Sequence, residues 1–205
     1  MENMANQISL CGTLATLPAF SHANHGRSFY RFSLEVERLS GTLDQLPVVV
    51  PEDVLLRAEL FEGTQLAVTG QLRSFNSRAA AGRRLILSVY ADSVTTTGDA
   101  PRNEVLLTGA VCKPPIYRRT PLGREICDVM LAVSRLYHRT DYIPCIFWGR
   151  LAQDISRLDV GTKLSVSGRL QSRDYVKLLP EGSETRTAYE VSAAEAEIIT
   201  EEQIF

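Results

Sequence analysis

Aromatic and arginine side chains alternate with apolar ones in two stretches of the chain. Successive side chains of a strand point to opposite faces. If the apolar residues at 143, 145 and 147 fill a core, Tyr142 and Trp148 point outward. If the residues at 164, 166, 168 and 170 do the same, the next stretch leaves these side chains outside: Arg169, Gln171, Arg173 and Tyr175.

Aromatic rings beside arginines on an outer sheet face suit single-stranded nucleic acid. Each base stacks on a ring for about 1–3 kcal/mol, and a guanidinium group pairs with phosphate. Further arginines accompany the two stretches at Arg135, Arg139 and Arg150, and a loop between the first strands adds Arg118, Arg119 and Arg124. The other interpretation is that the tyrosines form subunit contacts and the arginines solvate a surface, as in an assembly module without DNA binding.

The charge distribution favours the first interpretation. The net charge is −2, but residues 103–177 hold twelve Lys or Arg against seven Asp or Glu. Residues 178–205 hold one Arg and seven Glu. A basic module followed by an acidic end is therefore hidden in a near-neutral average.

Several function classes are not expected. The four cysteines form no CxxC pair and the three histidines complete no zinc spacing, so no metal site is predicted. We see no Ser/His/Asp order and no glycine-rich phosphate loop, so neither an enzyme nor a cofactor is expected. No apolar run approaches the ~20 residues of a membrane span. The short polar start and the unpaired cysteines predict a cytoplasmic protein.

The chain repeats itself at an offset of about 97 residues. The offset relates Gly12 to Gly109 and Asn6 to Asn103, and residues 63–66 match 161–164 one position later. Two copies of one fold follow. We expect repeat 1 at 1–97, a linker at 98–102 that follows a threonine run, repeat 2 at 103–200 and an acidic end at 201–205.

Each copy shows strands around a single helix. The second copy has alternating strand patterns and a helical spacing at 151–158, with Gly161 as the expected end of the helix. The first copy has strand patterns at 32–36 and 48–50 and a helix from about Glu52. The fold class predicted is all-β: two tandem five-stranded Greek-key OB barrels, each with one short helix.

The second copy resembles the bacterial single-stranded DNA-binding protein family. The resemblance lies in residues 103–109, 131–135, 140–152 and 161–170, in the family's order and spacing. It implies a five-stranded OB barrel and sequence-independent binding of single-stranded DNA. It also implies assemblies of four barrels, hence a homodimer of this chain. The family's base-stacking positions fall on Tyr137, Tyr142, Trp148 and Tyr175.

The first copy departs from that pattern. Ser40, Gln45 and Pro51 stand where the second copy has Tyr137, Tyr142 and Trp148. Phe75 is the one aromatic residue at an outward position of the matching strand, and Arg73 shares its face. We therefore expect the first copy mainly to build the dimer and to hold the second in place.

The function expected is coating and protection of single-stranded DNA in replication, repair and recombination. A primosome-type accessory OB protein, which binds DNA and a helicase partner, is an alternative. The terminal Ile204–Phe205, after an acidic stretch, resembles the family's docking tip for replication and repair proteins.

Overall fold

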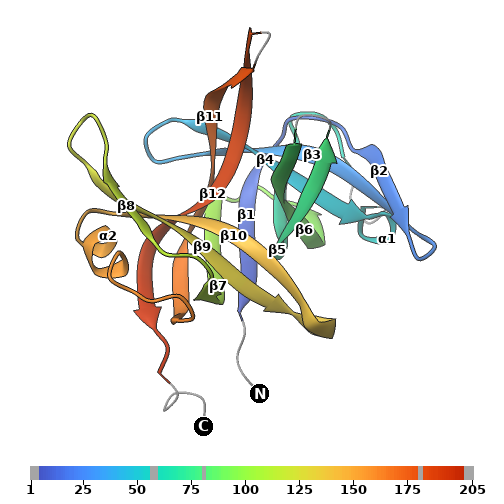
Figure 1. The fold of residues 1–205 in the computed structure, drawn as a ribbon. Coiled ribbons are helices and arrows are strands. Elements are labelled where there is room, and N and C mark those ends of the chain that lie inside the picture. The colour runs from blue at the N-terminus through green and yellow to red at the C-terminus, as the bar shows by residue number, and fades with distance from the viewer. Residues whose placement is uncertain (1–4, 56–59, 80–81, 180–181, 201–205) are drawn as a thin grey trace.

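The computed structural model describes residues 5–55, 60–79, 82–179 and 182–200 (Figure 1). Within these ranges, the first half of the chain contains β1 (Asn6–Leu14), β2 (Ala19–Asn24), β3 (Arg27–Glu37), β4 (Leu43–Pro51), α1 (Glu52–Leu55), β5 (Gln65–Ala79) and β6 (Gly82–Thr96). The second half contains β7 (Arg102–Val111), β8 (Ile116–Arg119), β9 (Glu125–Arg135), the 3-10 turn η1 (Leu136–His138), β10 (Arg139–Trp148), α2 (Gly149–Ile155), β11 (Lys163–Leu179) and β12 (Gly182–Ile198). The all-β class predicted from the sequence is confirmed.

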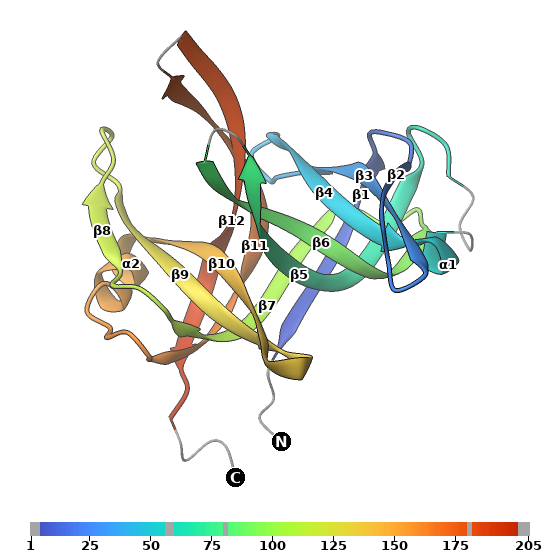
Figure 2. The ribbon, with the colours of Figure 1, turned by 45° about the vertical axis from the view of Figure 1, so that its right-hand side comes forward.

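The described strands pair in the same pattern in each half. In the first half the pairings run β1–β3–β4–β6–β5 and return to β1, and β2 pairs with β3 outside that ring. In the second half they run β7–β9–β10–β12–β11 and return to β7, and β8 pairs with β9. Figure 2 shows the two curled rings of strands side by side.

Strand alternation fills both interiors as predicted. Ile143 and Phe147 are fully buried and Cys145 nearly so, and Leu164 and Leu170 line the same core. Each ring of strands is stabilised by about 25 cal/mol for every Å² of apolar surface that it buries. Burial also raises the pKa of the Cys145 thiol to about 12, so it packs as an apolar group.

The repeated glycines mark where two strands approach closely. A Cβ atom at Gly12 would lie 2.3 Å from the backbone oxygen of Glu35, and one at Gly109 would lie 2.6 Å from that of Ala132. At these points β1 and β7 pass from one pairing partner to the other, which only glycine permits without a backbone shift.

Helix α2 is shorter than the sequence pattern predicts. The helix ends at Ile155, and Gly161 lies in the turn before β11 with a φ of 97°. The expectation that Gly161 follows the last helical turn is therefore wrong. Leu158 still packs on the core from the irregular segment after the helix, which explains the misleading helical spacing.

The two halves are joined by antiparallel pairing of β1 with β7. Asn6 lies opposite Leu107 and Cys11 opposite Arg102, so the two rings share one continuous sheet. The strands lie next to each other in the middle of the molecule (Figure 1). Backbone hydrogen bonds thus hold the halves together along these strands.

A buried carboxylate from the first half reaches into the second. Asp44 has no exposed side-chain surface and accepts two hydrogen bonds of 2.6 Å from the guanidinium of Arg38. The same carboxylate accepts from the backbone N–H and the hydroxyl of Ser172 on β11, at 2.7 and 2.9 Å. Arg38 also donates to the Ser172 carbonyl.

Asp141 of the second half, 97 positions after Asp44, makes the equivalent contact with the first half. Asp141 is equally buried and accepts from the Ser74 backbone N–H on β5 at 2.7 Å. Two guanidinium groups, from Arg73 and Arg135, lie 3.1 and 3.3 Å from its oxygens. Each half therefore anchors a carboxylate on the long hairpin of the other.

Burial and hydrogen bonding act in opposite directions on Asp44. Desolvation raises the pKa of the Asp44 carboxyl, but hydrogen bonds from Arg38 and Ser172 outweigh it and lower that pKa below its ordinary value. The folded chain therefore holds the ionised form of Asp44.

Removal of one buried carboxylate should destabilise the fold strongly. Asp141→Ala leaves two arginines and a backbone N–H without their acceptor, so we expect a loss of about 3–5 kcal/mol in the free energy of unfolding. Urea titration measures it. The control Asp128→Ala removes the surface partner of Arg118 and should cost at most about 1 kcal/mol. Equal losses for the two variants would contradict the role given to Asp141.

Acid should weaken the Asp44 contact. Because the folded pKa of Asp44 lies below the unfolded value, the ionised carboxylate stabilises the fold above about pH 4. That stabilisation is lost as the pH falls through the folded pKa. Unfolding free energies measured between about pH 6 and 3 should fall more steeply for the wild-type chain than for Asp44→Asn. Parallel curves for the two proteins would refute this prediction.

Candidate nucleic-acid interface

A groove of about 1710 Å³ runs over the outer face of the second half and the joined strands. We call it the main groove. The predicted residues that line it are Arg118, Arg124, Trp148, Arg169 and Arg173. The first half supplies one wall, through residues 37–40 between β3 and β4. The groove therefore belongs to both halves of the chain.

Trp148 is held at the end of β10, where α2 begins. Its side chain is 36% exposed, and its indole Nε1 donates a 3.0 Å hydrogen bond to the Ser192 hydroxyl on β12. Ile126 lies opposite it on β9. The hydrogen bond fixes one edge of the indole and leaves part of the ring at the surface, as a base-stacking platform needs.

Two arginines of β11 enter the same groove. Within the described part of the chain, Arg169 has a buried Nε atom without a hydrogen-bond partner. Arg173 is half exposed, lies 3.8 Å from Glu190 and sits 6.0 Å from the ring centroid of Tyr175. A buried N–H without an acceptor is costly. Arg169 also lines the groove, where a phosphate would offer its guanidinium group an acceptor.

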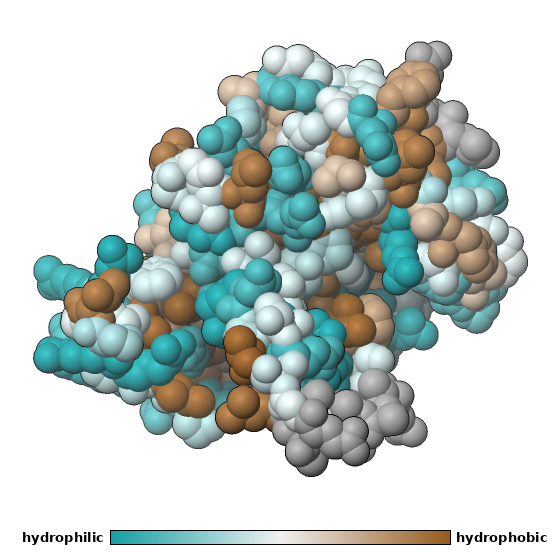
Figure 3. Space-filling model, turned by 90° about the horizontal axis from the view of Figure 1, so that it is seen from above, coloured by the Kyte–Doolittle hydropathy of each residue, from teal (hydrophilic) through white to brown (hydrophobic). Residues whose placement is uncertain are grey.

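Carboxylates share the main groove with these arginines. Its lining includes Glu37, Asp92, Glu104, Glu190 and Glu195. Seen from above, hydrophilic surface separates the apolar patches of the molecule (Figure 3). A ligand therefore meets cations at the Trp148 end and mixed charge over the joined strands.

Two positions predicted to point outward are covered instead. Gln171 is buried and donates a 2.9 Å hydrogen bond to Glu190. Ile146, between the exposed Tyr142 and Trp148, is only 4% exposed. Both lie on the expected face; Gln171 is held by Glu190 of β12, and Ile146 lies opposite Ser192 of the same strand.

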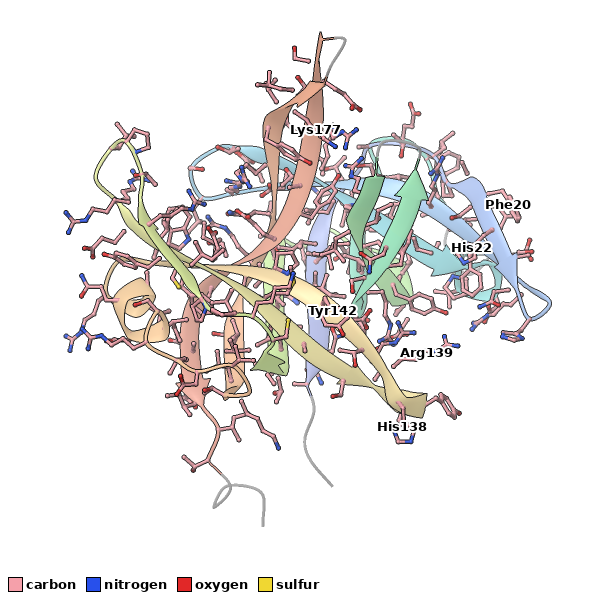
Figure 4. The ribbon with its side chains drawn as sticks, in the orientation of Figure 1. Phe20, His22, His138, Arg139, Tyr142 and Lys177 are labelled. Atoms are coloured by element: carbon pink, nitrogen blue, oxygen red, sulfur yellow. The ribbon has the colours of Figure 1, made fainter. Side chains whose placement is uncertain are left out.

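The remaining second-half tyrosines lie outside the main groove. Tyr137 is 90% exposed in η1, where its φ of 61° is unusual for a non-glycine residue. Tyr142 donates its backbone N–H to the Ser74 hydroxyl of the first half. Arg139 and Tyr142 lie along β10 toward the first half, beyond the His138 turn (Figure 4).

Several predicted arginines already serve other contacts. Arg135 and Arg73 are bound to Asp141, and Arg119 pairs with Glu125 at 2.9 Å. Arg150 is exposed in the first turn of α2, outside the main groove. The structure thus divides the predicted surface into a groove set and a set at the junction of the halves.

A second, smaller pocket of about 550 Å³ lies between the two long hairpins. Tyr175, Lys177 and Arg186 come from the β11–β12 hairpin, and Arg84 comes from β6. The Arg84 guanidinium donates to the Thr187 carbonyl at 3.0 Å, which ties the hairpins together. Tyr175 therefore lies at this pocket, with Arg173 between it and the main groove. Phe75 is exposed on the first-half hairpin.

Neither the groove wall at residues 37–40 nor the Ser192 contact was predicted from the sequence. Both depend on which segments meet in space, and the wall comes from the other repeat. Among the described residues, no three His, Cys, Asp or Glu side chains gather in a way that suits a metal ion. No helix in the described ranges is long and apolar enough to cross a membrane.

Comparison with known proteins finds a family match for the second half of the chain. The model of the single-strand binding protein family matches residues 102–199. Single-stranded DNA-binding protein 1 of Staphylococcus aureus is 38% identical over 80 residues, which are 36% of this chain and 48% of that protein. Single-stranded DNA-binding protein A of Bacillus subtilis is 36% identical over 80 residues, 36% of this chain and 46% of that protein. The chain thus spans about half the length of the curated relatives it matches.

The whole fold is also found among solved structures. The wild-type single-stranded DNA-binding protein from Thermus aquaticus superposes with a TM-score of 0.78 at 24% identity, over 96% of this chain and 94% of that one. A deletion mutant of the same protein superposes with a TM-score of 0.77. These structures establish the fold of both halves. The family model matches the second half alone, so the resemblance to the single-strand binding protein family is one of residues 102–199.

Proposed function

We propose that this chain binds single-stranded DNA without sequence preference, along the main groove. The observation that carries the proposal is the group of Trp148, Arg169 and Arg173 on one face, with an indole at the surface and an unpartnered guanidinium N–H beside it. Relatives that match this chain over 80 residues are named single-stranded DNA-binding proteins.

The groove chemistry supports binding to the backbone and to base faces. A base can stack on the exposed part of Trp148, since every base has a π-face. The phosphates that flank this base can accept hydrogen bonds from Arg169 and Arg173. Such phosphate contacts do not depend on the base sequence. Glu190 lies beside Arg173 and would be displaced or would repel a misplaced phosphate.

This activity suits a protein that coats and protects single strands during replication, repair and recombination. The family match favours it over an assembly module without DNA binding. The junction set, which includes Tyr137, Arg139 and Tyr142, is proposed as a secondary contact, and so is Arg150 of α2. Ile204–Phe205 lies outside the described residues, and its docking of replication or repair proteins stays a prediction.

We also propose that two chains associate through the outer face of the joined strands, which would place four rings in one particle. Residues 1–97 and 103–200 are then its structural units, with 98–102 as the linker. The outer face of β7 presents Leu106, which is 40% exposed beside Glu104, next to Gln7 and Ser9 of β1. These residues line the part of the main groove over the joined strands, so a second copy seated there leaves the Trp148 end of the groove to DNA. An apolar side chain within a polar strand face suits a self-complementary contact.

Oligo(dT) should quench Trp148, the single tryptophan of the chain. With a strand of about 35 nucleotides, log affinity should fall linearly with log salt, by about 0.7 per phosphate neutralised. Arg169→Gln should weaken binding about tenfold and reduce that slope by about 0.7, because one phosphate contact is lost. Arg135→Gln, whose side chain serves Asp141, should lower the unfolding free energy and leave the slope unchanged.

The result that sinks the proposed function is a folded chain whose fluorescence does not respond to oligo(dT) at low salt. If Arg135→Gln changed the slope as much as Arg169→Gln, the junction set and not the main groove would carry the phosphates.

The proposed dimer predicts a particle of twice the chain mass of 22.7 kDa. Leu106→Glu should shift sedimentation toward the single chain, because a carboxylate would then be buried between two copies. Leu122→Glu, at an exposed loop position, is the matched control and should remain dimeric. A wild-type chain that sediments as a monomer at micromolar concentration rules the dimer out.

A further inference from the structure

The first half carries a cluster of stacked rings on its outer face. His22 of β2 and Phe29 of β3 stack with centroids 4.8 Å apart and planes 11° from parallel. Phe29 in turn meets Tyr90 of β6 at 5.8 Å. We call these three residues the first-half stack. Figure 4 shows His22 and Phe20 on β2, on the side of the molecule away from α2.

Strand parity places Phe29 outside the ring of strands. Phe32 and Leu34 of the same strand fill the core, so Phe29 has the opposite parity. Phe29 is nevertheless only 6% exposed, because the neighbouring rings cover it. His22 is exposed and Tyr90 half-buried, so these two rings form the surface of the stack.

The stack occupies the face that corresponds to the Trp148 platform. Phe29 pairs with Pro51 in the first half, and Ile126 pairs with Trp148 in the second. The two residue pairs are equivalent, but the aromatic ring is on β3 in the first half and on β10 in the second. At an offset of 97 residues, Trp148 corresponds to Pro51, which has no aromatic ring. The aromatic ring of the first half is that of Phe29, on the strand opposite Pro51.

The other two rings also have counterparts around Trp148. Tyr90 lies opposite Val49 in the parallel β4–β6 pairing. Ser192, the hydrogen-bond partner of Trp148, lies opposite Ile146 at the equivalent place in the β10–β12 pairing. His22 lies opposite Phe29, and Arg118 of the main groove lies opposite Ile126. The two faces thus use equivalent strand positions with the aromatic residues redistributed.

Arginines flank the first-half stack. The Arg27 guanidinium lies 5.9 Å from the Phe29 centroid, and that of Arg73 lies 6.0 Å from the Tyr90 centroid. Arg31 is exposed two residues after Phe29 and shares its outward parity. Cations beside stacked rings favour a ligand that offers both flat faces and negative charge.

We propose that the first-half stack is a second contact surface for single-stranded DNA, separate from the main groove. Bases stack on His22 and Tyr90, and the intervening phosphates lie near Arg31, because the Arg27 guanidinium is already paired with Asp53 at 2.7 Å. This inference rests on the proposed function but assigns the contact to the half outside the family match. A long strand then engages both halves of one chain, whereas a short strand needs only one.

The test compares two strand lengths on the full chain. The variant combines His22→Ala with Tyr90→Ser, which places serine where the second half already has Ser192. A labelled oligo(dT) of about 35 nucleotides should bind about tenfold more weakly by anisotropy, because stacked bases are lost. Quenching of Trp148 by an oligo(dT) of about 8 nucleotides should be unchanged, since that length fits one barrel. Phe61→Ala, at an exposed first-half aromatic, should behave as wild type in both assays.

The outcomes separate this inference from the proposed function. If the double variant, shown by melting to be folded, binds the long strand as wild type does, the first-half stack is not a contact surface. If the variant instead loses self-association, the stack is an interface between copies and the proposal is wrong. If wild type binds neither strand, the proposed function fails and the inference fails with it.

Discussion

Two carboxylates without solvent exposure, Asp44 and Asp141, fix how the two rings of strands sit against each other. Asp44 accepts hydrogen bonds from one arginine and Asp141 from two, and each also accepts from a backbone N–H on the opposite hairpin. A buried charge is tolerated only when such partners surround it. The position of the long hairpins, and with it the walls of the main groove, depends on this pair of contacts.

The sequence alone predicted the interior much better than the exterior. Ile143, Cys145 and Phe147 are buried as alternation predicts, because strand parity is a property of the local chain. The parity of Gln171 was also correct, yet its side chain is covered by Glu190. Whether an outward side chain reaches solvent depends on segments far away in the sequence.

The same limit explains the candidate site. Arg135, Arg169 and Arg173 look equivalent in the sequence, but Arg135 is bound to Asp141 while Arg169 keeps an N–H without an acceptor. No local pattern separates an arginine that holds a neighbouring repeat from one that faces a groove. The groove wall at residues 37–40 was beyond prediction for a related reason, since it comes from the other copy.

The β1–β7 pairing has an evolutionary consequence. Two separate identical chains joined through such a strand pair would carry every substitution twice, once on each side of the symmetry axis. A covalent link removes that constraint, because each repeat mutates alone while the partner stays at high effective concentration. One repeat can then keep a tryptophan opposite Ile126 while the other gathers its rings around Phe29. Fusion therefore converts a symmetric partnership into one in which the two members can specialise.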